Sequence, residues 1–577
     1  MQREGYFLLL ILLASALGHL SSGPGLKHEC IHDELVKQFP LKGRSSLDRL
    51  GSQDLGDAQP LSHLQDKNTN PDPKFSSQFT GSMPANVDGW HQMRIYLNFS
   101  LTSEYVKQFP AQNTKFQMAS RLTQNVRKYF QDSLAVQFFE KFDYPGMYVE
   151  SMNLTIHPFS LPTDLYVLIW PEDKGKEGYY AAAGALDLSI VDERPCIGIY
   201  YLNFGPLETT VLHNLFLHST FAHEFTHILG FTGGLIPYFK DPVTGNSLTD
   251  IVETKKITSS NGGSETFTFI KTKEVVDFAR QYYGCPTLTG MPLENNGGSG
   301  SVGSHWEKLF LPTEYMNPTV ENPGIISGFT FAFLRGTGWY KTKVDAAQYY
   351  DWGKGEGCKY FSICPSTKNG AYCAAKDKGQ PVCSSEYYSK SVCYSDTRYS
   401  SADCPVRTPL LQVCTMDPLP HPNGYPVMKG EEFGPGSRCI LWKATDSYGT
   451  TKNTPKCHKT YCEKGQVKIK VGTKVYSCPQ DIDQKLGVIK ISDERGVLTT
   501  MECPNAADFC EEFAQRCPED CNNNGICIGK NRCNCFIGFT GPSCKRYWRV
   551  LDKKSLLTSS KPNLQIATAL SSAFHSI

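Results

Sequence analysis

Three side chains within one pentapeptide have the clearest capacity for chemistry. His223, Glu224 and His227 lie in the run His-Glu-Phe-Thr-His. Residues four apart share one face of a helix, so the two imidazoles would point at a single metal ion. Glu224 lies about 100° further round the helix, where its carboxylate can reach a water on the metal without becoming a ligand. The layout predicts a Zn²⁺ site with its own general base, as peptide-bond hydrolysis requires.

The pentapeptide alone is a weak signal, because two histidines on a partly exposed helix arise often by chance. Its surroundings favour the metal site. Residues 208–229 contain no Pro or Gly and carry apolar residues at helical spacing, which predicts a buried helix that stops at Gly230. His213 and His218 lie on the same predicted helix outside the four-residue register with His223, so we expect them to be structural.

The elements before this helix predict a mixed layer of strands and helices. Residues 165–170 and 196–204 are apolar, aromatic runs bounded by Pro and Gly, which is typical of central strands. Residues 94–99 also have a strand pattern, and residues 116–142 have the pattern of one long amphipathic helix. Strands that alternate with a helix indicate an α/β layer that leads into the metal-binding helix.

The part after Gly230 contains more glycine and predicts an inserted subdomain over residues 231–304. A short helix is expected at residues 273–283 and a glycine-rich loop at 295–303. A further helix is predicted at residues 325–335. The cysteine-rich remainder up to about residue 510 is expected to be held by disulfides more than by packing.

Two histidines leave a zinc ion short of a protein ligand. In one superfamily of zinc proteases the chain turns at a glycine three residues after the second histidine, and a third histidine follows three residues later. Gly230 has the turning position, but position 233 is also glycine. The best remaining candidate is His305, 78 positions after His227. Met316, eleven positions beyond His305, could form a methionine turn under the metal.

Segments 223–231, 292–307 and 314–318 together resemble leishmanolysin, a family of metzincin zinc endopeptidases in which an insertion separates the glycine from the third histidine. The resemblance implies an α+β fold: a metzincin-type protease domain with a mixed sheet, an active-site helix and an inserted subdomain, then a disulfide-rich domain. It also implies the site residues, namely His223, His227 and His305 as zinc ligands, Glu224 as general base and Met316 as the methionine-turn residue. Position 318 is Pro, so a tyrosine ligand after the turn is not expected.

The same resemblance gives a meaning to Cys30. The run His-Glu-Cys-Ile-His-Asp at residues 28–33 is similar to the family's pro-segment motif, whose cysteine is assigned a latency role. A thiolate is a good fourth zinc ligand and would displace the water. The alternative is an ordinary disulfide cysteine. Because the chain has 22 cysteines, a free Cys30 requires at least one more unpaired cysteine.

The C-terminal cysteines predict a separate small module. Six of them between residues 517 and 544 have spacing and a Gly-Phe-Thr-Gly run that resemble an EGF-like module. That resemblance implies the pairs Cys517–Cys527, Cys521–Cys533 and Cys535–Cys544. A zinc-binding knuckle is the competing interpretation, which a secreted chain disfavours.

Several features predict the secretory pathway and an extracellular or cell-surface location. An apolar run at residues 6–17 after Arg3 is typical of a signal peptide that ends near residue 23, and 19 of the 22 cysteines follow Gly357. Asn98 and Asn153 begin glycosylation sequons. A net charge of +1 gives no reason to expect nucleic acid as a partner. Residues 559–577 only faintly resemble a lipid-anchor signal, so secretion without an anchor is favoured.

The predicted domains are a signal peptide (1–23), a pro-segment (24–88), the N-terminal catalytic subdomain (89–230), the inserted subdomain with the third ligand and methionine turn (231–352), a cysteine-rich domain (353–512), the EGF-like module (513–546) and a tail (547–577). The leading hypothesis is a zinc endopeptidase with protein or peptide substrates. The rival is an adhesion protein that binds extracellular matrix or cell-surface proteins through its C-terminal domains. A metal-storage role is disfavoured, because three ligands and an adjacent glutamate leave one position open for water.

Overall fold

The computed structural model describes most of the chain from residue 89 onward. The described residues are 78–79, 89–175, 179–207, 211–258, 264–296, 302–319, 324–362, 372–373, 375–394, 404–416, 427–445, 451–479, 487–492, 498–529 and 531–547. The predicted signal peptide, the pro-segment cysteine Cys30, most of the glycine-rich loop and the tail beyond residue 547 lie outside them. No helix in the described part has both the length and the apolar character to cross a membrane.

The first layer is a four-stranded sheet in the order β10-β11-β9-β3. Its strands are β3 (Ile95–Asn98), β9 (Leu165–Glu172), β10 (Ala181–Leu188) and β11 (Pro195–Asn203). β3, β9 and β11 run parallel, and β10 pairs antiparallel with β11. β9 and β11 are apolar along most of their length because both faces of the sheet are covered.

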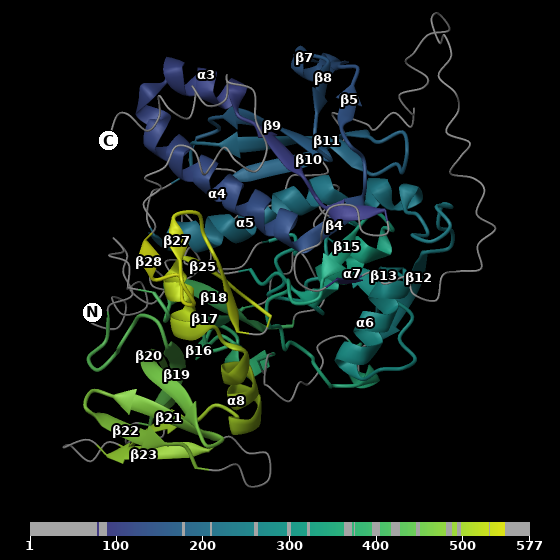
Figure 1. The fold of residues 1–577 in the computed structure, drawn as a ribbon. Helices are drawn as coiled ribbons and strands as arrows, with labels where there is room; N and C mark the ends of the chain where they lie inside the picture. Colours follow the sequence, from purple (N-terminus) through teal and green to yellow (C-terminus); the bar gives the residue numbers. More distant parts are fainter. Residues whose placement is uncertain are drawn as a thin grey trace, which may run out of the picture.

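The two faces of this sheet enter different hydrophobic clusters. Alternate residues of β9 point to opposite sides, so Val167 and Ile169 pack with the helices while Tyr166 and Leu168 face small hairpins. The helices are α4 (Asn113–Ser133) and α5 (Val211–Leu229), which lie side by side on one face (Figure 1). The hairpins are β5 (Phe142–Tyr144) with β8 (Phe159–Leu161), and β6 (Met147–Val149) with β7 (Leu154–Ile156). The shorter α3 (Ser100–Gln108) packs against β9.

The long helix predicted over residues 116–142 is wrong in its last third. α4 ends at Ser133, and Leu134 is already extended. Residues 134–137 instead form β4 (Leu134–Gln137), which pairs with β2 (Trp90–Gln92) and β15 (Lys341–Lys343); β1 (Gln78–Phe79) joins at the edge. Leu134, Ala135 and Val136 are fully buried in this second sheet. Pairing with residues distant in sequence therefore decides where the helix stops.

The inserted segment contains its own sheet beside the predicted helix. The helix is α6 (Lys273–Tyr283), with the predicted bounds. The sheet joins β12 (Val252–Thr258), β13 (Ser264–Ile270) and β14 (Met291–Leu293), none of which the pattern indicated. α7 (Gly328–Gly336) begins later than predicted, because Ser327 caps it by accepting a hydrogen bond from Phe329 N at 3.2 Å.

The cysteine-rich domain is packed as well as cross-linked, contrary to the prediction. A six-stranded sheet follows the order β22-β21-β20-β19-β24-β23, and α8 (Ala506–Gln515) contacts it. Ile440, Val467, Ile469 and Met501 form a hydrophobic cluster with Phe509 of that helix. The strands are β19 (Ser437–Thr445), β20 (Thr451–Glu463), β21 (Gln466–Val471), β22 (Lys474–Ser477), β23 (Val488–Ser492) and β24 (Leu498–Glu502), preceded by a smaller sheet of β16 (Pro381–Cys383), β17 (Ser389–Tyr394) and β18 (Val406–Val413).

The C-terminal module consists of two short hairpins. β25 (Gly525–Ile528) pairs with β26 (Arg532–Cys535), and β27 (Phe539–Thr540) pairs with β28 (Arg546–Tyr547). The structure forms the disulfides Cys517–Cys527, Cys521–Cys533 and Cys535–Cys544. The domain boundary drawn at residues 512 and 513 falls inside α8, so the module begins after that helix.

Candidate metal centre

Helix α5 carries His223, Glu224 and His227, and all three side chains are fully buried. The two imidazole centroids lie 4.8 Å apart. The helix ends at Leu229 because Gly230 has φ +125°, and a Cβ there would come within 2.8 Å of the Trp339 ring. This reversal sends the chain back past the last helical turn.

The third histidine comes from the end of the inserted segment, as the resemblance implied. Its carbonyl accepts a hydrogen bond from Glu294 N at 2.9 Å, and Trp306 N donates to Met316 O at 3.0 Å. The His305 ring centroid lies 5.2 Å from that of His223 and 5.0 Å from that of His227. One ring nitrogen from each of the three histidines lies within 4.8 Å of the others. The structure thus brings together side chains that are 78 positions apart in the sequence.

Backbone carbonyls fix the tautomers of two of these rings. His223 Nδ1 lies 2.6 Å from Tyr315 O, and His227 Nδ1 lies 2.7 Å from Phe231 O. A carbonyl only accepts, so each Nδ1 carries the proton and each Nε2 carries a lone pair. The two Nε2 atoms are 3.1 Å apart. Two imidazole lone pairs aimed at one point, with a third imidazole beside them, match the donor set that binds zinc.

The turn at Tyr315 and Met316 packs against the histidine cluster and orients one of its rings. Tyr315 supplies the carbonyl that orients His223, and its hydroxyl lies 2.8 Å from Thr226 Oγ1 on α5. Both side chains are fully buried, as is Met316. The sequence analysis named Met316 but not Tyr315 or Thr226. Any residue type can supply a backbone carbonyl, and the Thr226–Tyr315 hydroxyl contact joins residues 89 positions apart.

A buried carboxylate, Glu314, holds this turn in shape. It accepts hydrogen bonds from Met316 N at 2.5 Å, Ser327 Oγ at 2.9 Å and Thr330 Oγ1 at 2.6 Å. Burial raises the pKa of Glu314 to about 7, although these hydrogen bonds oppose the shift. Thr330 also accepts from Trp306 Nε1 at 3.0 Å, so the turn and the third ligand share one network.

Two further buried carboxylates lie next to His305, one directly after β14 and one in the loop that carries His305. Glu294 accepts from Asn296 N at 2.9 Å and Glu307 accepts from Leu309 N at 3.0 Å. Burial raises the pKa of both groups, that of Glu307 to about 8. These contacts fix the backbone on each side of His305. Nothing in the residue pattern singles out the two glutamates.

The Glu224 carboxylate lies beside the histidines without replacing one of them. One of its oxygens is 3.8 Å from His223 Nε2. Tyr200 of β11 lies near enough that burial, and then the charge of Glu224, raise the pKa of its phenol. The carboxylate therefore lies beside His223 and close enough to Tyr200 to act on it electrostatically.

The predicted glycosylation sites and two further buried residues are not part of the three-histidine cluster. His218 is buried on α5, where burial lowers its pKa to about 3. Cys196 is a free, buried thiol in β11. Both ends of the Asn98 amide are used within the fold, on Tyr166 and on Ser100 N, whereas Asn153 is exposed. Although Cys517, Cys521 and Cys533 lie close enough to suggest a metal site, each is in a disulfide.

The comparisons with known proteins match the part of the chain that carries these residues. Residues 162–410, which include the three histidines, Glu224 and Met316, match leishmanolysin. Over this range, which is less than half of the chain, the sequence is similar to the leishmanolysin family. Residues 517–546 match a Teneurin-like EGF domain. The disulfides and this module indicate an extracellular or secretory-pathway protein.

The relatives share only part of the chain. A Leishmanolysin-like peptidase of Caenorhabditis briggsae is 32% identical over 169 residues, which are 25% of this chain and 26% of the relative. The Drosophila melanogaster Leishmanolysin-like peptidase is 30% identical over 212 residues, 32% of this chain and 31% of the relative. The Ciliated left-right organizer metallopeptidase of Mus musculus is 29% identical over 238 residues, which are 40% of this chain and 32% of the relative. The chain thus spans about a quarter to a third of the length of these relatives.

Proposed function

We propose that the chain is a secreted or cell-surface zinc endopeptidase that hydrolyses internal peptide bonds of proteins, with Glu224 as the general base. One observation carries the proposal. The Nε2 atoms of His223 and His227 converge at 3.1 Å, His305 completes the set, and a Glu224 oxygen lies 3.8 Å from His223 Nε2. A site for metal storage would not need a buried base beside three ligands.

Zinc bound by His223, His227 and His305 would lower the pKa of a water and polarise the peptide carbonyl. The protein's part is to hold the geometry and to move protons. The carbonyls of Tyr315 and Phe231 keep the protons of His223 and His227 on Nδ1. Glu224 accepts the proton of the attacking water and later delivers it to the leaving amine. Because Glu224 is fully buried, its charge acts in a medium of low dielectric.

The adhesion alternative uses the C-terminal domains and treats the protease fold as a relic. A relic would be free to lose a ligand or the base. His223, Glu224, His227 and His305 are all in place and fully buried. These features favour the enzyme. We further propose that the chain is made as a latent precursor through Cys30, which lies outside the described residues.

The test is incubation of the purified protein with a peptide library, with and without a zinc chelator. We expect cleavage at internal bonds that is lost with the chelator and restored by added zinc. Cleavage that the chelator leaves unchanged would overturn the metal mechanism. Absence of cleavage by zinc-loaded, processed protein would favour the adhesion alternative.

A further inference from the structure

The EGF-like module, residues 517–547, is packed into the catalytic core. Ile526, Ile528 and Phe536 of the module belong to the same hydrophobic cluster as Phe221 and Phe225 of the active-site helix. These three side chains are at most 9% exposed. Figure 1 places the module directly beside α4 and α5. A module that served only as a spacer would have no reason to bury its apolar residues against another domain.

One short stretch of the module contacts both α4 and α5. Ile537 N donates to the Oδ1 of Asn125 on α4 at 2.7 Å, and Asn125 is a buried polar residue. The ring of Phe536 stacks on His218 of α5, with centroids 5.0 Å apart and planes 29° apart. Tyr129 of α4 meets His218 edge-on, with centroids 6.4 Å apart. Residues 536–537 thus join the two helices at one place.

The other side of the module is fixed to two more parts of the chain. Gly529 N donates to Ala347 O at 2.9 Å, and Arg532 pairs with Asp345 at 3.1 Å. Asp520 pairs with Arg438 of the cysteine-rich sheet at 2.7 Å. Arg438 is fully buried, so this ion pair is sheltered from solvent. The module therefore has a defined position relative to both large domains.

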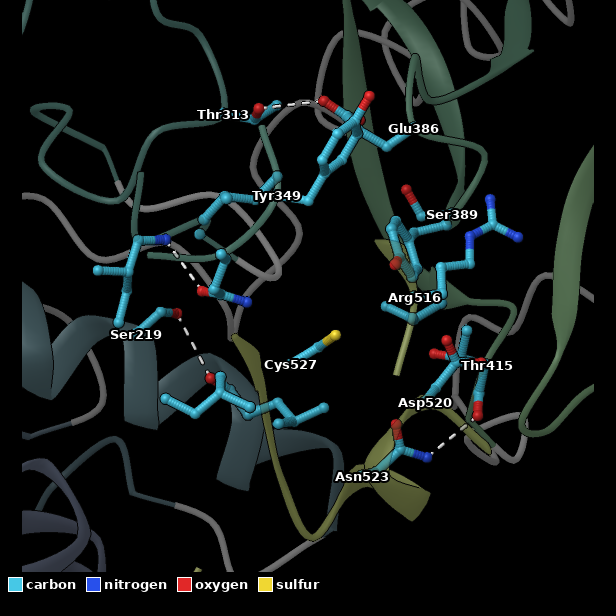
Figure 2. A pocket seen from close by; sticks show the side chains of 18 of the residues that line it. Ser219, Thr313, Tyr349, Glu386, Ser389, Thr415, Arg516, Asp520, Asn523 and Cys527 are labelled. Atoms are coloured by element: carbon cyan, nitrogen blue, oxygen red, sulfur yellow. Dashed lines mark hydrogen bonds between the residues drawn. The ribbon is translucent and has the colours of Figure 1, made fainter. Parts of the chain in front are cut away.

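A cavity of about 130 Å³ lies where the three domains meet (Figure 2). Leu215, His218 and Ser219 of α5 line it together with Ile526 and Cys527 of the module. On its far side Asn523 of the module donates to Thr415 O at 3.0 Å. The module thus approaches α5 both across this cavity and through the Phe536 stack.

We propose that the EGF-like module positions the active-site helix, so that loosening the module lowers catalysis although no module residue touches the metal centre. The inference rests on the proposed endopeptidase function. His218 precedes His223 by five residues, about 7.5 Å along the helix axis. A rigid helix transmits a small shift over that distance. Misplacement by about 1 Å near the reacting atoms can cost about 100-fold in rate.

Two variants of the full chain loosen the module by different means. Phe536→Ala removes the ring that stacks on His218. Gly529→Ile inserts a side chain where a Cβ already meets the Asp345 backbone at 3.2 Å, which would push the module away. Tyr547→Ala is the matched control, because Tyr547 belongs to the same module and is 69% exposed. Phe536→Tyr retains the ring and should restore wild-type behaviour.

The first measurement is amide hydrogen exchange in the first half of α5, which needs no catalytic activity. We expect about tenfold faster exchange in Phe536→Ala and Gly529→Ile, the size of a ~1.4 kcal/mol loss in local stability, and no change in the control. Exchange unaltered in both variants would overturn the inference, whatever the protein's activity. If Gly529→Ile fails to fold, Phe536→Ala alone decides.

The second measurement is cleavage of a short peptide with zinc content determined in parallel. We expect kcat to fall about tenfold with zinc retained and KM little changed, since positioning affects the reacting geometry more than binding. Faster exchange with unchanged kcat would limit the module to a stabilising role and would contradict the inference. Inactive wild-type protein would instead defeat the proposed function, and the exchange result would still report on the docking.

Discussion

The Nε2 atoms of His223 and His227 face each other at 3.1 Å while both Nδ1 atoms donate to backbone carbonyls. Two lone pairs at this separation repel each other unless a cation lies between them. The helix supplies the spacing, but the carbonyls of Tyr315 and Phe231 supply the orientation. The arrangement of the three histidines therefore depends as much on the turns around α5 as on the helix itself.

Replacement of His305 by Ala should remove the third ligand. The two remaining imidazoles cannot complete a stable zinc site, so we expect bound zinc to fall from near-stoichiometric to a small fraction and peptide cleavage to be lost. Metal analysis after dialysis measures the change. His157→Ala is the control, because His157 is exposed and distant in the sequence from the site. Unchanged zinc content in His305→Ala would mean that the third ligand lies elsewhere.

The Thr226–Tyr315 contact should couple the helix to the methionine turn. Thr226→Val and Tyr315→Phe each remove one partner of a fully buried hydrogen bond of 2.8 Å, at an expected cost of about 1–2 kcal/mol in the free energy of unfolding. Urea denaturation of both single variants and the double variant gives the coupling. We expect about 1 kcal/mol, and strictly additive losses would show that the two hydroxyls do not interact.

Site residues that are close together in the sequence could be predicted from it, whereas contacts between residues far apart in the sequence could not. The four-residue spacing in α5 and the stop at Gly230 are local, so pattern alone placed His223, Glu224 and His227 on one buried helix. The residues alone made His305 only the best remaining candidate, and the resemblance to a known family was needed to assign it as the third ligand. The roles of the Tyr315 and Phe231 carbonyls could not be predicted from the sequence, because every residue type carries a backbone carbonyl.

In the fold, too, features set by local sequence were predicted and features set by distant contacts were not. α6 has its predicted bounds because its amphipathic pattern and Gly284 at the C-terminus are local signals. The helix predicted to reach residue 142 stops at Ser133, since Leu134 to Gln137 find strand partners on β2 and β15. The docking of the EGF-like module was not predicted at all. Its cysteines specify the module, whereas Phe536 looks like an ordinary residue of its loop.

Acid should destabilise the fold through His218. Burial lowers its pKa to about 3, below the reference value of 6.5, so the unfolded chain binds the proton more readily than the folded chain. Its contribution to stability is complete above pH 6.5 and is lost as the pH falls toward 3. His218→Phe keeps a ring against Phe536 and removes the titration. The variant should lose less stability than wild type, by a few kcal/mol at most, in denaturation measured from about pH 7 to pH 4.

Equal acid sensitivity of the wild type and His218→Phe would contradict this account of His218. The comparison between the two proteins matters more than either curve, because the carboxylates titrate in both. Glu314 changes in the opposite sense: its pKa of about 7 means that its contribution weakens as the pH rises toward 7.

Latency through Cys30 predicts an active precursor when the thiol is absent. Cys30→Ser should give full-length protein that cleaves peptide before any trimming, while the wild-type precursor stays silent until its pro-segment is removed. Peptide cleavage by freshly purified precursor, with and without limited proteolysis, measures the difference. Cys196→Ser controls for loss of a thiol, because Cys196 is free and buried in β11. A silent Cys30→Ser precursor that trimming activates would argue against the switch.

The most direct test of the central claim is the activity of Glu224→Gln in processed protein loaded with zinc. Glutamine keeps the size of the side chain but cannot accept the proton of the attacking water. We predict that zinc content and folding stay as in the wild type while kcat for peptide cleavage falls by about 10²- to 10⁴-fold. Cleavage at the wild-type rate, with zinc bound, would contradict the assignment of Glu224 as the general base.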